Sequence, residues 1–470
     1  MQEYYREKEY TKAKKVFIDN FINQLKLSNL SFFLGAGVSV GAGFPSWEEL
    51  LDDIANDIGI DLKKETNYYK IFQYCVNELS LSTVKQRVYE KLSKLSYKSE
   101  GIESALRLPI DSFWTTNFDQ VLEKNIEFKH AVRPIIIYKD SDLTNVQSNL
   151  SRANFKVFKL NGHLEDRKSW VLTQSDLEKY RDDHSGMLTF FRRELVQNTF
   201  FFLGNSFTDT VILSALSEVK KYFGELNQYH YTILKRDKER QDFEFFVRDL
   251  EKRYGIKTLV VESYSEIPIV INEISERLRK RQVYFSGSFR SISREEQDFV
   301  TGLSEKLTTM LLEYGFKICS GMGRRLGDLI AGSSLRWLVE NNHIVSKSLV
   351  LRPDKYYQHG ADGKPNDITR RMREYAQHDS GIAVFICGQE TEDSSGSEGT
   401  YQEFEIAKEN NLKIIPIGAT GYEARKIWQE VKNNITRYGY LEKYIDKLND
   451  EANPDELAKI VVQIIKDIQQ

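Results

Sequence analysis

Short apolar runs that end in glycine or polar residues recur along the first half of the chain. They occupy residues 30–34, 110–114, 155–160, 199–203, 230–234 and 258–261. Residues 15–27 have apolar positions at helical spacing, and residues 47–96 predict several further helices. Buried strands with special residues at their carboxyl ends are typical of an open, largely parallel α/β sheet, whose crevice lies outside those ends.

The second half of the chain repeats the alternation of strand and helix. Its predicted strands cover residues 283–285, 316–319, 348–351, 382–386 and 413–417, with amphipathic helices between them. A charged helical segment, residues 275–281, precedes the first of these strands. Because 470 residues exceed the usual size of one core, we expect two domains, residues 1–281 and 282–470, with a small helical subdomain in the first.

The composition narrows the class of protein. With 66 basic and 69 acidic side chains the net charge is −3, which does not favour a nucleic-acid partner. No stretch approaches the roughly 18 apolar residues of a membrane span, so we expect no membrane association. The three cysteines, Cys75, Cys319 and Cys387, include no CxxC pair, which argues against a zinc site and a disulfide framework. We therefore expect a cytoplasmic protein without a metal.

A glycine turn follows the first predicted strand. In Gly35-Ala36-Gly37-Val38-Ser39 we expect the glycines to adopt positive φ and the N–H groups of the next helix to point at a pyrophosphate. A tight turn that binds nothing is the alternative interpretation. The neighbouring residues 41–47 contain two more glycines, and we expect them to form a mobile apolar flap beside the turn.

Three polar side chains follow later predicted strands. The amide of Asn117 can bond sugar hydroxyls and orient a water molecule, although Asn and Asp also cap helices, and Asp119 could do only that. The imidazole of His163 can take a proton from a ribose hydroxyl or from water near neutral pH, unless the ring is purely structural. Because each follows a strand end, we expect Asn117 and His163 to meet at one crevice beside the glycine turn.

Five ordered segments together resemble a sirtuin-type domain over roughly residues 15–270. The segments are Gly-Ala-Gly-Val-Ser at 35–39, Gly-Phe-Pro at 43–45, Thr-Thr-Asn-Phe-Asp at 115–119, Asn-Gly-His at 161–163 and Gly-Asn-Ser-Phe-Thr-Asp at 204–209. The resemblance implies a Rossmann-type parallel sheet with a small helical subdomain and a pocket for NAD+.

The same resemblance implies a role for each matching residue. The glycine turn would hold the pyrophosphate, Asn117 would face the nicotinamide ribose, and His163 would be the general base. Asp119 would orient the strand end or stabilise developing positive charge. The residues implied to bind NAD+ are Gly35, Ala36, Gly37, Ser39, Gly204 and Ser206.

The chain also departs from the protein deacylases of that family. It lacks their four-cysteine zinc module, so we do not expect it to bind acyl-lysine. The forms Lys-Leu-Asn-Gly-His and Gly-Asn-Ser-Phe-Thr-Asp look like the bacterial defence branch, whose members hydrolyse NAD+ outright. In that reaction nicotinamide is already a cationic leaving group, so the enzyme mainly has to brace the ribose, exclude bulk solvent and position one water.

The second half carries its own glycine-rich turns, which are typical of phosphate cradles. The spacing of Gly396, Gly399, Thr400 and Glu403 is similar to the signature of lysine-decarboxylase-like nucleotide domains, and residues 282–470 resemble a doubly wound SLOG nucleotide-sensor domain. A Rossmann-like domain used only for assembly is the alternative. The residues implied to bind a nucleotide are Gly287, Ser288, Gly321, Gly323, Arg373, Gly399, Thr400 and Glu403. Arg352 and Arg371 are weaker candidates. Alternatively, Arg370, Arg371 and Arg373 could form the solvated face of one helix.

Both halves together resemble the NAD+-depleting effectors of the Thoeris antiphage system. That resemblance implies a cyclic ADP-ribose isomer as activator, a TIR-domain partner protein that makes it, and a homotetramer or larger homo-oligomer. Two other interpretations stay open at this stage. One is a nucleotide phosphoribohydrolase with its chemistry in the C-terminal domain, and the other is a non-enzymatic module that senses NAD+ or ADP-ribose.

Overall fold

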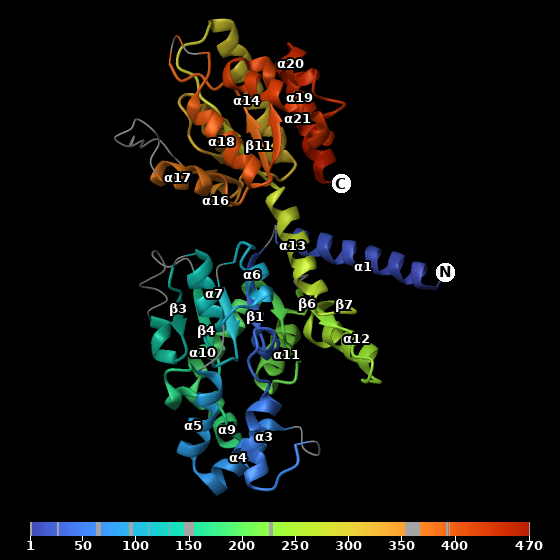
Figure 1. Ribbon diagram of the computed structural model, residues 1–470, viewed down its shortest axis with the longest axis vertical. Coiled ribbons are helices and arrows are strands. Elements are labelled where there is room, and N and C mark those ends of the chain that lie inside the picture. The colour runs from blue at the N-terminus through green and yellow to red at the C-terminus, as the bar shows by residue number, and fades with distance from the viewer. Residues whose placement is uncertain are drawn as a thin grey trace. The chain divides into compact units, whose positions relative to one another are not determined.

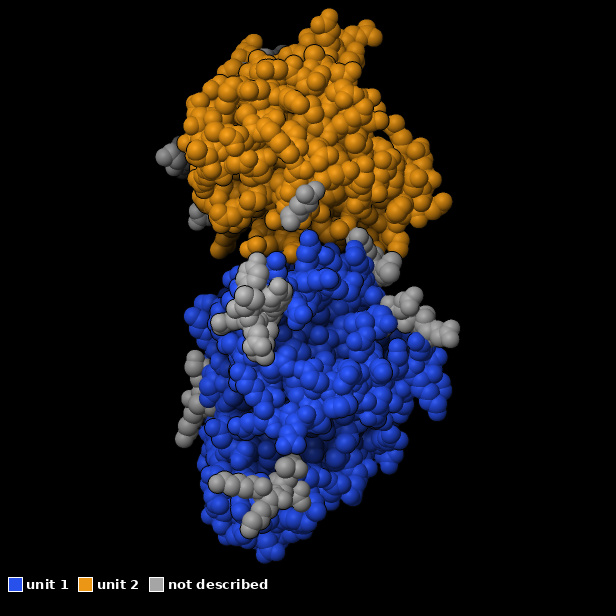
Figure 2. Space-filling view, turned by 90° about the vertical axis from the view of Figure 1, so that its right-hand side faces the viewer, with its two compact units in different colours: residues 1–274 blue, residues 275–470 orange. Residues whose placement is uncertain are grey.

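The computed structural model divides the chain into two compact units, residues 1–274 (unit 1) and 275–470 (unit 2), coloured separately in Figure 2. It describes residues 2–25, 28–62, 67–93, 97–110, 112–130, 132–144, 155–224, 229–352, 367–391, 393 and 395–469. Helix α13 (Glu266–Arg279) crosses the division. Its last residue accepts a hydrogen bond of 2.7 Å from the N–H of Gly381 in unit 2. The end of this helix is therefore bonded to unit 2.

Unit 1 is built on a parallel sheet, which confirms the predicted α/β class (Figure 1). In the described residues its strands run in the order β3 (Ile135–Ile137), β4 (Lys156–Lys159), β2 (Ser112–Thr115), β1 (Asn29–Leu34), β5 (Asn198–Leu203), β6 (His230–Lys235) and β7 (Ile256–Val261). The sequence pattern missed β3, because a three-residue edge strand is too short to show a period.

The helices described in unit 1 lie before, between and after these strands, with α2 to α6 all between β1 and β2. They are α1 (Gln2–Gln24), α2 (Ala36–Val40), α3 (Trp47–Asp57), α4 (Tyr68–Leu79), α5 (Leu81–Leu92), α6 (Glu100–Ala105), α7 (Val121–His130), α9 (Gln174–Asp183), α10 (Ser185–Gln197), α11 (Thr210–Phe223) and α12 (Phe243–Tyr254). Figure 1 shows α3, α4, α5 and α9 gathered at one end of the unit, where they form the helical subdomain.

Aromatic side chains bury both faces of the central strands. Phe32 of β1 stacks on Phe201 of β5 with 5.3 Å between ring centroids, and Phe201 also meets Phe21 of α1. The next residue, Phe33, points to the other face and meets Phe191 of α10 at 5.7 Å. Because side chains alternate along a strand, helices on both faces require an uninterrupted apolar run.

Unit 2 contains a second parallel sheet and confirms the predicted doubly wound fold. Its strand order in the described residues is β10 (Leu349–Leu351), β9 (Lys317–Ser320), β8 (Gln282–Ser286), β11 (Ile382–Phe385) and β12 (Lys413–Pro416). The helices are α14 (Arg294–Glu313), α15 (Leu326–Glu340), α16 (Val345–Ser348), α17 (Asp367–Gln377), α18 (Glu398–Glu409), α19 (Tyr422–Asn433), α20 (Lys447–Asp450) and α21 (Pro454–Gln469). The order reverses between β8 and β11, where such folds form a crevice.

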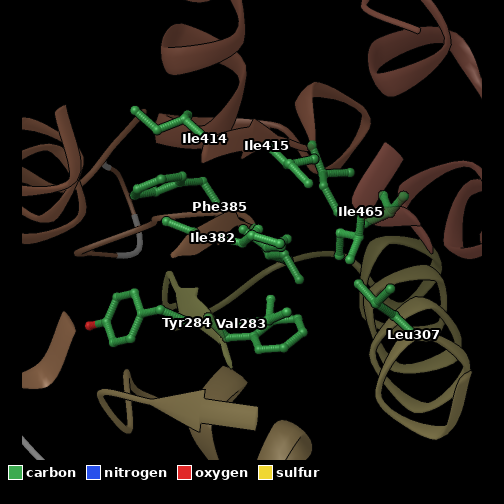
Figure 3. Close-up of a cluster of buried hydrophobic side chains, with 14 of the residues drawn as sticks. Val283, Tyr284, Leu307, Ile382, Phe385, Ile414, Ile415 and Ile465 are labelled. Atoms are coloured by element: carbon green, nitrogen blue, oxygen red, sulfur yellow. The ribbon is translucent and has the colours of Figure 1, made fainter. Parts of the chain in front are cut away.

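The core of unit 2 joins this sheet to the helices that cover it. Figure 3 shows Val283 of β8 and Ile382 of β11 with Leu307 of α14 and Ile465 of α21, and all four side chains are fully buried. Burying one such side chain contributes about 1.5–3 kcal/mol. Among the helices described in either unit, none has the length and apolar character needed to cross a bilayer.

Candidate functional site

Four loops begin side by side at the carboxyl edge of the first sheet. The last residues of β4, β2, β1 and β5 pair in register, so Lys159, Thr115, Leu34 and Leu203 form one row across the sheet. Every predicted site residue of the first domain follows one of these strands. The fold therefore places the predicted segments along one edge.

The glycine turn after β1 packs directly against the loop after β5. The N–H of Gly35 bonds to the carbonyl of Leu203 and the N–H of Gly37 to the carbonyl of Gly204, each at 2.9 Å. A Cβ on Gly37 would lie 2.9 Å from the Cα of Gly204, which itself has φ +68°. These glycines are required because two backbone segments are nearly in contact.

The expectation of positive φ in this turn was wrong. Gly35 has φ −93°, and Gly37 lies inside helix α2. Both N–H groups bond to the β5 side, so they are not directed at a phosphate. Of the amides at 35–37, that of Ala36 has no hydrogen bond within the described residues. The close approach of two loops, rather than backbone handedness, selects glycine here.

Asn117 is held by the glycine turn itself. Its Nδ2 donates to the carbonyl of Gly35 and to the Oγ of Ser39, both at 3.0 Å. Ser39 in turn donates to Oδ2 of Asp119 at 2.8 Å. Because Nδ2 is used in these bonds, Oδ1 is the amide atom of Asn117 left to interact with a ligand.

Asp119 joins the turn to the helix that follows β2. Its Oδ1 accepts a 3.0 Å hydrogen bond from the N–H of Val121 at the start of α7. The side chain is buried, and this burial raises the pKa of its carboxyl group, an effect that the nearby ammonium of Lys159 opposes. Both carboxylate oxygens therefore have partners within the protein, in keeping with the capping alternative.

A buried lysine that the sequence prediction missed lies beneath these loops. Lys159, at the end of β4, has only 1% of its side chain exposed. Its Nζ donates to Oε1 of Glu123 on α7 at 2.7 Å, to the carbonyl of Phe118 at 3.1 Å and to the carbonyl of Asp119. A lysine within an apolar run is a usable signal, because fully buried lysines are almost always paired.

His163 follows the tight turn after β4. Gly162 has φ +103°, and a Cβ there would collide with the carbonyl of Ser169. The backbone of His163 is held on both sides: its N–H donates to Ser169 Oγ at 3.1 Å, and its carbonyl accepts from Trp170 Nε1 at 2.8 Å. The loop conformation therefore fixes the position from which the ring extends.

The imidazole of His163 is largely enclosed. Its side chain is 10% exposed, and Nδ1 lies 3.9 Å from Oε1 of Glu123. Burial, together with the positive charge of Lys159, lowers the pKa of His163 to about 4. The ring is therefore neutral near pH 7 and has one nitrogen able to accept a hydrogen bond.

The loops that carry Asn117 and His163 are bonded to each other. The N–H of Leu160 donates to the carbonyl of Thr115 at 2.8 Å, and the N–H of Leu164 donates to the carbonyl of Phe118 at 3.0 Å. The two predicted catalytic residues thus extend from adjacent, mutually supported loops at one edge of the sheet.

The predicted flap is packed onto the rest of unit 1. Phe44 is 3% exposed, and its N–H donates to the carbonyl of Ser39 at 3.0 Å. The ring of Trp47 lies 5.8 Å from that of Phe118 and 6.1 Å from that of Tyr69. The aromatic side chain of Trp47 thus packs on the loop after β2 and on α4, which holds this segment against the unit.

The loop after β5 presents Ser206 to solvent. Next to it, Asn205 donates from Nδ2 to the carbonyl of Phe33 at 3.2 Å, which ties the loop to β1. Asp209 caps α11 through the N–H of Val211 at 2.9 Å. Burial raises the pKa of the Asp209 carboxyl group. Capping accounts for Asp209, whereas the exposed Ser206 shares a 2.8 Å hydrogen bond with Oγ1 of Thr208.

In unit 2 the predicted glycine turns also pack against one another. Gly287 has φ +138°, and a Cβ there would collide with the carbonyl of Ile386 after β11. A Cβ on Gly323 would collide with the carbonyl of Gly287, and one on Gly321 would lie 2.6 Å from the hydroxyl of Tyr284. The loops after β8, β9 and β11 therefore converge at the point where the strand order reverses.

The remaining residues of the predicted nucleotide site adjoin these loops or lie on neighbouring helices. Gly399 and Thr400 lie in the first turn of α18, and a Cβ on Gly388 after β11 would be 3.2 Å from Thr400 Oγ1. Ser288 accepts two N–H bonds at its carbonyl, from Gly388 at 2.9 Å and Gln389 at 2.8 Å.

Two of these predicted residues, Arg373 on α17 and Glu403 on α18, are 2% and 8% exposed. Arg373 donates a hydrogen bond to Gln402, which also lies on α18, and this bond joins the two helices.

The weaker arginine candidates have other partners. Arg352 bonds to Asp379 at 2.5 Å and to the carbonyl of Tyr375 at 2.7 Å. Arg370 pairs with Glu374 at 2.9 Å and also with Glu409. Arg371 is exposed. Among the residues that the structure describes, no cluster of His, Cys, Asp and Glu side chains could hold a metal ion.

Comparisons with known proteins give the same two-part organisation. A family model described as "Sir2- and TIR-associating SLOG family" matches residues 266–468, and a model described as "SIR2-like domain" matches residues 111–259. The chain is 30% identical to "NAD(+) hydrolase ThsA" of Enterococcus faecium, over 97% of this chain and 99% of the relative. It is 28% identical to a protein of that name from Bacillus cereus (strain MSX-D12), over 96% and 98%.

Gly37→Ala is expected to destabilise unit 1 by about 1–3 kcal/mol, because the new methyl group would press on Gly204. Gly332→Ala is the matched control, since that helical glycine has open space around it, and alanine there should stabilise by about 0.5–1 kcal/mol. Urea titration monitored by circular dichroism measures both. An unchanged stability of Gly37→Ala would contradict the close approach of the two loops.

The stability of unit 1 is expected to fall as the pH drops from about 6.5 towards 4. In this window the unfolded chain protonates His163, whereas in the folded protein the lowered pKa of about 4 keeps the ring neutral. The loss from this residue alone is about 2 kcal/mol at pH 5. His163→Gln should lose that much less stability between pH 7 and pH 5, whereas His343→Gln, on the surface of unit 2, should behave like wild type.

Proposed function

The chain belongs to the family of NAD(+) hydrolases named ThsA, and from this premise we propose that unit 1 hydrolyses NAD+ and releases nicotinamide. The observation that carries this proposal is the row of strand ends from which the loops bearing Gly35, Asn117, His163 and Gly204 begin. An amide and a neutral imidazole beside a glycine turn are suited to bracing a ribose and positioning water.

In the proposed reaction the bond between nicotinamide and C1′ of the ribose breaks. The leaving group takes the bonding electrons and departs as neutral nicotinamide, so it requires no protonation. Water adds to the oxocarbenium-like ribose, which gives ADP-ribose and one proton. Because the ring of His163 is neutral near pH 7, its unprotonated nitrogen can accept a hydrogen bond from that water as the new bond forms.

The surrounding contacts support a proposed role for each of these residues. Asn117 uses Nδ2 to hold the glycine turn, which leaves Oδ1 to accept a bond from a ribose hydroxyl. The turn around Ala36 would contact the pyrophosphate, and Gly204 and Ser206 would border the adenosine. Asp119, bonded to Ser39 and to the start of α7, would keep Asn117 in place.

Asn117→Ala and His163→Ala are each expected to reduce nicotinamide release at least about 100-fold, since each removes a group that positions the sugar or the water. Asn77→Ala, on the exposed face of α4, is the matched control and should keep wild-type activity. Chromatography of nicotinamide and ADP-ribose provides the measurement, with melting curves to verify folding. Full activity in both site variants would move the chemistry elsewhere, including to unit 2.

We further propose that unit 2 regulates this reaction by binding a cyclic ADP-ribose isomer. Its support is the convergence of three glycine-rich loops at the reversal of strand order, with Arg373 and Glu403 buried on neighbouring helices. By resemblance, a TIR-domain partner protein makes the messenger during phage infection. The chain would act in the cytoplasm as a homotetramer or larger homo-oligomer and deplete the NAD+ of its host cell. A ligand activates only if it binds the active arrangement more tightly than the inactive one.

Arg373→Ala and Glu403→Gln are expected to raise the concentration of activator needed for half-maximal NAD+ consumption at least about tenfold, because each removes a charge that would contact the nucleotide. Basal hydrolysis should stay unchanged. Arg336→Ala, which removes an exposed arginine of α15, is the control. A panel of cyclic ADP-ribose isomers tested by NAD+ consumption measures the effect, and an unaltered response in both variants would place the ligand elsewhere.

A further inference from the structure

Two neighbouring buried polar atoms, Nδ1 of His163 and Oε2 of Glu123, have no hydrogen-bond partner within the described part of the chain. The two residues are 8% and 4% exposed, and Nδ1 lies 3.9 Å from the other carboxylate oxygen, Oε1. Because buried polar groups are nearly always bonded, this pair requires an explanation.

The carboxylate of Glu123 is the fixed member of the pair. Its Oε1 accepts a 2.7 Å bond from Nζ of Lys159. The same ammonium group donates to the carbonyls of Phe118 and Asp119, so Lys159 is held from three directions. Any closer contact must therefore come from rotation of the imidazole towards the carboxylate.

Other charged groups near the ring are accounted for by their own contacts. Asp166, in the loop of His163, pairs with Lys139 at 2.5 Å. Glu165, in the same loop, acts on the ring only as a nearby charge. The ring of Tyr138 lies beside the imidazole, with 5.4 Å between the ring centroids and a tilt of 36° between the planes. The carboxylate that faces Nδ1 directly is that of Glu123.

We propose that Glu123 is a positioning residue for His163: it accepts the Nδ1–H of the neutral imidazole and so leaves Nε2 unprotonated for the reaction. Lys159 holds this carboxylate in place. An approach of about 1 Å would convert the 3.9 Å separation into a normal hydrogen bond. Such bonds are often long without substrate and tighten when it binds. The proposal deepens the hydrolase function proposed above and rests on it.

The tautomer of His163 tests the proposal without any turnover. Full-length protein labelled with ¹⁵N-histidine gives the two nitrogen shifts of each ring, and the spectrum of His163→Gln assigns those of His163. We expect a protonated Nδ1 and an unprotonated Nε2 at pH 7. A protonated Nε2 in the wild-type protein would overturn the proposal. If the protein never consumes NAD+, the hydrolase function fails, whereas this measurement still decides the tautomer.

Kinetics then separate positioning from simple charge compensation of Lys159. Glu123→Gln should lower kcat about 100-fold with KM within about threefold, because a carboxamide can donate to Nδ1 and favour the wrong tautomer. Glu123→Asp also pairs with Lys159 but keeps the carboxylate, so it should recover at least about tenfold of that loss. Glu127→Gln, which removes a surface ion pair on the same helix, is the control and should match wild type.

Equal activity of Glu123→Asp and Glu123→Gln, or wild-type activity in Glu123→Gln, would reduce Glu123 to a structural counter-ion. The spectrum of Glu123→Gln supplies the complementary result, a loss of the pure Nδ1–H tautomer. If Glu123→Gln does not fold, the wild-type spectrum and Glu123→Asp still test the proposal. In that case an aspartate variant whose His163 shows the Nε2–H form would overturn it.

Discussion

The ammonium group of Lys159 has to be neutralised inside the protein, because its side chain has almost no contact with water. A buried charge without partners would cost several kcal/mol, so the surrounding chain must supply them. The partners come from the loop after β2, which contributes two carbonyls, and from α7, which contributes the carboxylate of Glu123. One buried cation thereby sets the relative positions of the segments that carry Asn117 and His163.

A second constraint acts on the other side of β1. The glycine turn and the loop after β5 approach so closely that neither has room for a Cβ at Gly37 or Gly204. The turn then gives Asn117 a fixed carbonyl and a fixed hydroxyl to bond to. The ammonium group of Lys159 and the glycine turn both bond to the loop after β2, the first through Phe118 and Asp119 and the second through Asn117. This shared loop explains how adjacent parallel strands produce a rigid polar edge, on which a sugar and a water molecule can be oriented.

In unit 2 several loops also meet at the carboxyl edge of a parallel sheet, and there glycines without a Cβ allow the close approach. Its glycines let the loops after β8, β9 and β11 converge, and the buried Arg373 joins α17 to α18 through Gln402. A nucleotide bound at this convergence, as proposed above, would touch several of these packed loops at once. Such a ligand has a physical route to influence more than its immediate contacts, which is the requirement for a sensor.

The apolar runs and the residues after them were sufficient to predict both parallel sheets, most of the strands and the edge that carries Asn117 and His163. These features could be read locally, because burial on both faces demands continuous apolar residues and parallel strands place their ends together. Three features needed folded coordinates. The edge strand β3 has too few residues for a period, the role of Gly37 depends on Gly204 far along the chain, and the pairing of Lys159 with Glu123 joins β4 to α7. Each depends on distances between segments remote in sequence, and such distances arise only when the chain packs.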